Sequence, residues 1–143
     1  ESKRIKTRLD GDDKDSIIRE LVDLLADAGA VADREAAEAV VFEREKTMST
    51  GMENGIAIPH GKTDTVDQLI AAMGLKPEGV DFQCVDGQPA RIIILTLSPA
   101  NRTGPHIRFM AGISKLLRSE RVRDRLLRAS NADDIRSVLA EAE

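Results

Sequence analysis

One short run of residues constrains the fold more than any other part of the chain. Residues 91–97, Arg-Ile-Ile-Ile-Leu-Thr-Leu, are almost all β-branched or aliphatic. Such side chains favour a strand, and a strand without polar alternation is buried on both faces of its sheet. A sheet that is buried on both faces needs a layer of helices on each side. The run therefore predicts a three-layer α/β domain.

Amphipathic spacing predicts helices on both sides of this run. Asp15 and Gly29 are candidate caps of the first helix, Asp33 begins the second, and Ser119 caps the fourth. The predicted helices cover about 16–28, 33–46, 106–117, 119–128 and 132–142.

Further strands are predicted between these helices. Residues 69–75 have the composition of a strand, and residues 82–85 predict another short one before the Asp86-Gly87 turn. A short strand is also expected within the glycine-rich stretch 49–63. Because helices and strands do not alternate strictly, we expect one α/β domain over residues 1–143, with a mixed sheet flanked by helices on both faces.

Composition argues against several classes of function. No apolar run approaches the ~20 residues that a membrane-spanning helix needs, and no signal-peptide pattern is present. Aromatic residues make up only 2% of the chain and the net charge is −4, so we expect no nucleic-acid partner. Cys84 is the only cysteine, which excludes an internal disulfide. These features predict a cytoplasmic protein without direct membrane insertion.

The charges are unevenly distributed along the chain. Residues 10–53 contain thirteen acids and five bases, whereas residues 102–128 contain eight bases and two acids. The basic stretch, which includes Arg118, Arg121 and Arg125, is compatible with a solvated helix face. It is equally compatible with a docking surface for phosphate or an acidic protein.

The two histidines are the main candidates for chemistry. His60 lies in Ile-Pro-His-Gly at the expected end of a short strand. His106 follows Pro105 just inside the start of a predicted helix, where backbone N–H groups favour anions. A lone histidine is more often a structural side chain, but the shared position after a proline at an element boundary makes a functional role as plausible as a structural one.

Other chemistries fit the residues poorly. Gly55 and Gly61 are separated by five residues instead of the four of a phosphate-binding P-loop, and Pro59 removes a backbone donor. Two histidines lack the third ligand of a catalytic zinc site, so no metal and no cofactor are expected. Cys84 has no neighbouring base in the sequence and is expected to be a small buried side chain.

The sequence Gly-Ile-Ala-Ile-Pro-His60-Gly, followed by His106 at the start of a helix, resembles the EIIA domain of the fructose/mannitol type. This domain belongs to the bacterial phosphotransferase system, and nitrogen-regulatory EIIA proteins share the pattern. The resemblance covers nearly the whole chain, including the Arg-Glu stretch before the motif and the closing helices.

The resemblance implies a phosphotransferase with a phosphohistidine intermediate. His60 would take a phosphoryl group from the carrier protein HPr, or a paralogous carrier, and pass it to an EIIB domain. The family's second histidine corresponds to His106, and an arginine that meets the phosphate corresponds to Arg44. Since both donor and acceptor are imidazoles, no magnesium is implied.

Three hypotheses remain after this comparison. The chain is a phosphocarrier in sugar uptake, a free-standing regulator that controls partners through the state of His60, or a domain that uses neither histidine. The presence of both histidines and Arg44 makes the last the weakest. Partner proteins are expected to dock around His60, with four candidate apolar contacts: Met48, Met52, Ile56 and Ile58.

Overall fold

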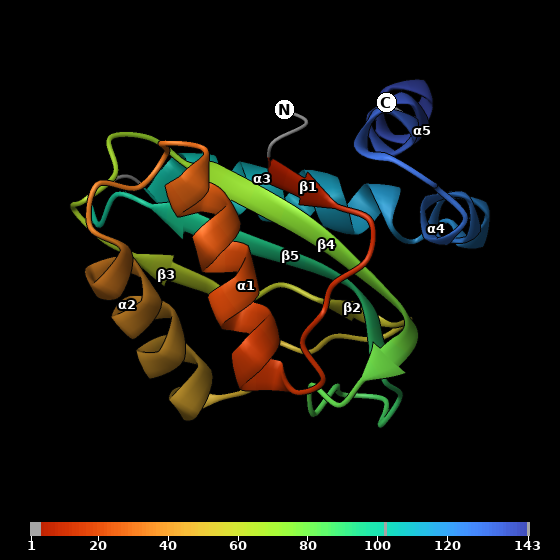
Figure 1. Ribbon diagram of the computed structural model, residues 1–143, viewed down its shortest axis with the longest axis horizontal. Coiled ribbons are helices and arrows are strands. Elements are labelled where there is room, and N and C mark those ends of the chain that lie inside the picture. Colours follow the sequence, from red (N-terminus) through yellow and green to blue (C-terminus); the bar gives the residue numbers. More distant parts are fainter. Residues whose placement is uncertain (1–3, 102, 143) are drawn as a thin grey trace.

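The computed structural model describes residues 4–101 and 103–142 and has the expected mixed α/β architecture (Figure 1). The elements, in chain order, are β1 (Ile5–Lys6), α1 (Lys14–Asp27), α2 (Arg34–Thr47), β2 (Ile56–Ala57), β3 (His60–Lys62), β4 (Ile70–Val80), β5 (Ala90–Ser98), α3 (Thr103–Leu116), α4 (Glu120–Leu127) and α5 (Ala132–Ala142).

The sheet is mixed, as predicted. Its order is β1-β4-β5-β2, and β3 also pairs with β5. β4 and β5 are antiparallel, whereas the other pairs are parallel. β2 and β3 pair with successive parts of β5, since Ile56 lies opposite Ile92 and His60 lies opposite Thr96. Pro59 separates the two short strands, a position that an edge of a sheet tolerates.

Each face of the sheet carries its own hydrophobic core. Along β5, Ile93 and Leu95 pack with α1 and α2, whereas Ile92 and Ile94 pack with residues of α4 and α5. Figure 1 shows α1 and α2 on one side of the sheet and α3 on the other. The residues of β5 from Ile92 onward are buried, which confirms the strand expected from its composition.

Local capping explains where the helices begin. α1 starts at Lys14, two residues before the predicted start, because Asp13 caps it by accepting a hydrogen bond from Ser16 N at 2.8 Å. The predicted cap, Asp15, lies within the first turn instead. Ser119 caps α4 as predicted, and Asp33, predicted as the first residue of the second helix, is its N-cap instead.

Two strand predictions need correction, and one strand was not predicted. Residues 82–85 form no strand; Phe82 is fully buried and Gln83 adopts a left-handed φ of 55°, which breaks an extended run. β4 continues to Val80 through an irregularity after Leu75. β1 was not expected, because two residues are too few for a recognisable pattern. Within the described residues, no helix is both long and apolar enough to cross a bilayer.

Candidate active site

His60 was expected at the end of a strand but is the first residue of β3, because Pro59 divides the expected single strand into β2 and β3. The backbone orients its ring. Its Nδ1 lies 2.9 Å from the carbonyl oxygen of Ile58. A carbonyl oxygen only accepts hydrogen bonds, so Nδ1 carries the hydrogen in this contact. The lone pair of the neutral ring is therefore on Nε2, which is left available as a nucleophile or ligand.

His106 lies in the first turns of α3 and faces His60. The ring centroids are 5.0 Å apart, with 43° between the ring planes. Burial, followed by the nearby charges of His60 and Lys62, lowers the pKa of His106 below its ordinary value of 6.5. The lowered pKa favours the neutral form of His106. Its Nδ1 is buried and has no hydrogen-bond partner among the described residues.

Arg44 meets the two histidines at one cavity. The cavity has a volume of about 580 Å³ and is lined by Val40, Glu43, Arg44, Thr47, His60, Gly61, Lys62 and His106. Arg44 donates from Nη1 to the carbonyl oxygen of Met48 at 2.8 Å. This contact occupies part of the planar fork of the guanidinium and leaves other N–H groups for an anion.

Close packing of α2 on β3 brings Arg44 to the histidines. A Cβ atom on Gly61 would lie 2.7 Å from Val40 Cγ2 and 3.1 Å from the backbone of Val40 and Val41. Only glycine permits this approach. The glycine of the histidine motif therefore sets the separation between the strand that carries His60 and the helix that carries Arg44.

A buried ion pair supports the loop between α2 and β2. The carboxylate of Glu45 accepts hydrogen bonds from Thr50 N at 2.8 Å and Thr50 Oγ1 at 2.6 Å. Lys14 Nζ, at the start of α1, lies 2.7 Å from the same carboxylate. Glu45 follows Arg44 directly, so the ion pair holds the end of α2 as well as the loop.

The structure adds residues that the sequence did not single out. Lys62 lines the cavity because it lies two residues after His60 on β3, and residues at that spacing share a face of a strand. Val40, Glu43 and Thr47 line it from α2. Strand periodicity could have indicated Lys62, but the α2 residues depend on how the helix packs.

The candidate docking residues have different environments. Ile56 and Ile58 are 6% and 1% exposed and belong to the core, so they offer no docking surface. Met48 is 69% exposed beside the cavity-lining end of α2. Ile107, which follows His106, is 62% exposed and was not among the predicted contacts.

The other candidate chemistries remain without support in the described residues. There, no three His, Cys, Asp or Glu side chains come together as metal ligands would. Cys84 is buried, as expected, and burial raises the pKa of its thiol. A thiol with a raised pKa is a poor nucleophile at neutral pH.

Comparisons with known proteins identify the family of the chain. Residues 1–142 match the family model described as phosphoenolpyruvate-dependent sugar phosphotransferase system, EIIA 2. The fructose-specific EIIA component of Haloferax volcanii is 40% identical over 128 residues, which are 90% of this chain and 83% of that protein.

Two solved structures extend the comparison to the fold. The nitrogen regulatory protein IIA-Ntr from Neisseria meningitidis has a TM-score of 0.89 at 29% identity, covering 97% of this chain and 94% of that one. The mannitol IIA enzyme of Escherichia coli, in complex with phosphorylated IIB, has a TM-score of 0.85 at 25% identity, covering 99% and 96%.

The family match, with the mixed sheet shared by these neighbours, defines the class of the protein as a phosphotransfer component. The chain belongs to the EIIA 2 family of the phosphoenolpyruvate-dependent sugar phosphotransferase system. This family includes both sugar-specific and nitrogen-regulatory relatives of the chain.

Proposed function

We propose that His60 accepts a phosphoryl group from phospho-HPr, or a paralogous carrier, and passes it to an EIIB domain in sugar uptake. The observation that carries this proposal is the hydrogen bond from His60 Nδ1 to Ile58, which leaves the Nε2 lone pair free in a cavity with Arg44 and His106. The bond from phosphorus to the donor nitrogen breaks as the bond to Nε2 forms, and the Nδ1 hydrogen stays on the ring.

Neighbouring groups would stabilise the transferring phosphoryl group. Its transition state spreads negative charge over three equatorial oxygens, so positioning and electrostatics provide most of the catalysis. Arg44 would supply charge-assisted hydrogen bonds, and His106 would orient the group from the start of α3. Lys62 adds a second positive charge along the same cavity.

A regulatory role is the second candidate, and a specific similarity favours it. The nitrogen regulatory protein of Neisseria meningitidis matches the fold over nearly the whole chain. Phosphorylation of His60 would place negative charge beside the exposed side chains of Met48 and Ile107, so a partner that docks there would sense the state of the histidine.

The proposed chemistry also implies protein partners and a cellular location. The donor carrier and the EIIB recipient are the proposed protein partners, and residues 1–143 are proposed to act as one EIIA domain in the cytoplasm. No cofactor takes part in the proposed step, since both ends of the transfer are imidazoles.

The proposal is tested by intact mass after incubation with phosphoenolpyruvate, Enzyme I and HPr. The wild-type protein should gain one acid-labile phosphoryl group, and His60→Ala should gain none. His106→Ala should still accept the group but transfer it more slowly, because His106 only orients it. An unmodified wild-type protein, or equal loss in both variants, would contradict these assignments.

A second measurement separates transport from regulation. The phosphorylated protein is mixed with a purified fructose-type EIIB domain, and loss of phosphate from His60 is followed by mass. Rapid transfer supports the phosphocarrier in sugar uptake, whereas stable retention of the phosphoryl group favours the regulatory role.

A further inference from the structure

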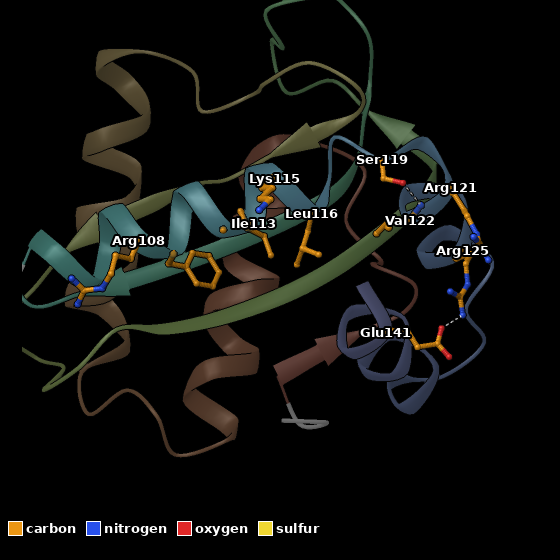
Figure 2. Close-up of a pocket in the computed structure, with 11 residues that line it drawn as sticks. Arg108, Ile113, Lys115, Leu116, Ser119, Arg121, Val122, Arg125 and Glu141 are labelled. Carbon is orange, nitrogen blue, oxygen red and sulfur yellow. Dashed lines mark hydrogen bonds and ion pairs between the residues drawn. The ribbon is translucent and has the colours of Figure 1, made fainter. Parts of the chain in front are cut away.

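A groove separate from the histidine cavity lies between α3, α4 and α5 (Figure 2). Its volume is about 790 Å³, and none of its lining residues lines the cavity of His60. Four apolar side chains contribute to the groove: Phe109, Ile113 and Leu116 from α3, and Val122 from α4. All four are only partly buried.

α3 is incompletely covered by the rest of the described chain. It is 14 residues long, yet none of its residues is buried. Phe109 and Ile113 pack against the core on this face of the sheet, but one side of each stays open to the groove. An apolar helix face that its own chain leaves uncovered is a common feature of interaction sites.

Cationic side chains without a described partner surround these four apolar side chains. Arg108, Lys115 and Arg121 line the groove and have no hydrogen bond or ion pair with any residue that the structure describes. Figure 2 shows Arg108 near one end of the groove and Arg121 near the other. Arg125 is paired with Glu141, at 2.5 Å, and Glu141 is the only acid in the lining.

The acids of α4 do not line the groove: two of its arginines do, whereas the third, Arg123, lines another cavity together with the acids. Arg121 and Arg125, four residues apart, line the groove. Glu120 and Asp124, also four residues apart, line a different cavity. Since α3 contains no acid at all, both helices present positive charge to the groove. This segregation makes the groove complementary to an acidic occupant.

We propose that the groove docks an amphipathic helix of a partner protein, apolar on the face that enters and acidic along its flanks. The lining of α3 extends from Arg108 to Leu116, or about 12 Å at 1.5 Å per residue, which matches two turns of a docked helix. Gly112 lies midway and has open space around it, so a helix can approach closely.

A second copy of this chain is a poorer occupant. α1, α2 and α5 are the most acidic helices, but their apolar residues pack in this chain's own cores, including the fully buried Leu21 of α1, Val41 of α2 and Ile135 of α5. Within the described residues, an acidic helix with a free apolar face is therefore lacking. The occupant has to come from another protein.

The test uses a fluorescein-labelled 18-residue peptide with leucines at i, i+3, i+4 and i+7 spacing and glutamates elsewhere. Fluorescence anisotropy should show binding to the unphosphorylated protein that weakens as salt rises. A peptide with the same leucines and lysine in place of glutamate should bind at least tenfold more weakly. His60→Ala should bind like wild type, so the result does not depend on the proposed phosphoryl transfer.

Matched variants locate the binding. Arg121→Glu and Leu116→Ser should each weaken the acidic peptide at least tenfold, whereas Arg118→Glu, with the same charge change outside the groove, should not. Circular dichroism verifies that each variant is folded. No binding, equal loss in Arg118→Glu and Arg121→Glu, or self-association in sedimentation that the Arg121 variant abolishes would each overturn the proposal.

Discussion

In the proposed reaction, one hydrogen bond of one residue leaves Nε2 as the nitrogen of His60 that would accept the phosphoryl group. The acceptor is the carbonyl of Ile58, two residues earlier, and Pro59 between them fixes the course of the backbone. The choice of tautomer is therefore built into the local sequence Ile-Pro-His and does not depend on a distant side chain. Arg44 and His106, by contrast, reach the cavity only through the packing of α2 and α3.

Replacement of Arg44 by lysine should impair phosphoryl acceptance although the charge is kept. An ammonium lacks the planar fork that can hold Met48 O and a phosphate oxygen together. Loss of a charge-assisted hydrogen bond worth about 1.5–3 kcal/mol corresponds to a rate roughly 10- to 100-fold lower. The rate of phosphoryl transfer from phospho-HPr can be measured by quenched flow. An Arg44→Lys rate equal to that of wild type would remove Arg44 from the site.

The lowered pKa of His106 should make stability depend on pH. The unfolded chain binds a proton near the ordinary pKa of 6.5, whereas the folded protein binds it only at lower pH. Stability should therefore decline as pH falls through 6.5 toward the folded pKa, and stop declining below it. Urea midpoints measured from pH 7.5 to 5 should fall further for wild type than for His106→Gln. An equal fall of the urea midpoint in wild type and His106→Gln would contradict this prediction.

At the scale of elements, the contact of β3 with α2 should be the least tolerant of change. Gly61→Ala places a methyl group 2.7 Å from Val40 Cγ2, and we expect a loss of about 1–3 kcal/mol together with slower phosphoryl acceptance. The matched control is Gly112→Ala, in open space on α3, which should be neutral or stabilising. Thermal unfolding of both variants tests this; equal melting temperatures would refute the steric argument.

The elements that could be predicted from the sequence are those whose signal is local. The spacing of apolar residues indicated the five helices that the structure describes. An unbroken run of aliphatic residues indicated β5. Residues 82–85 looked like a strand because Phe82 and Cys84 are apolar, but they point into the core from a loop. β1 exists only through its pairing with β4, a contact that no local pattern encodes.

The residues that line the cavity also divide into those with a local signal in the sequence and those placed by packing. His60 and His106 stood out because they are the only histidines and both follow a proline at an element boundary. Val40, Glu43 and Thr47 did not stand out in the sequence. Nothing in the sequence of a polar helix marks the turn that will line a cavity, because this depends on how the helix packs. Ile56 and Ile58 could have faced either way. Ile56 pairs with Ile92 of β5, and Ile58, two residues later, is buried as well.

At the scale of the whole molecule, chain topology explains where the cavity lies. β3 runs parallel to β5, so the strands end at the same edge of the sheet, and His60 pairs with Thr96 near the end of β5. After β5 the chain passes directly into α3, whose first turns carry His106. Such an edge, where parallel strands end and a helix begins, is a usual place for ligand sites in α/β folds.

The ion pair of Lys14 with Glu45 joins the start of α1 to the end of α2, so its loss should destabilise more than one element. Lys14→Met leaves the carboxylate of Glu45 buried without its cation, and we expect the free energy of unfolding to fall by about 3 kcal/mol. Adding Glu45→Gln removes the stranded charge while its side-chain oxygen can still accept from Thr50 N. The double variant should therefore recover part of the loss in urea unfolding. Additive losses would show that the two side chains act independently.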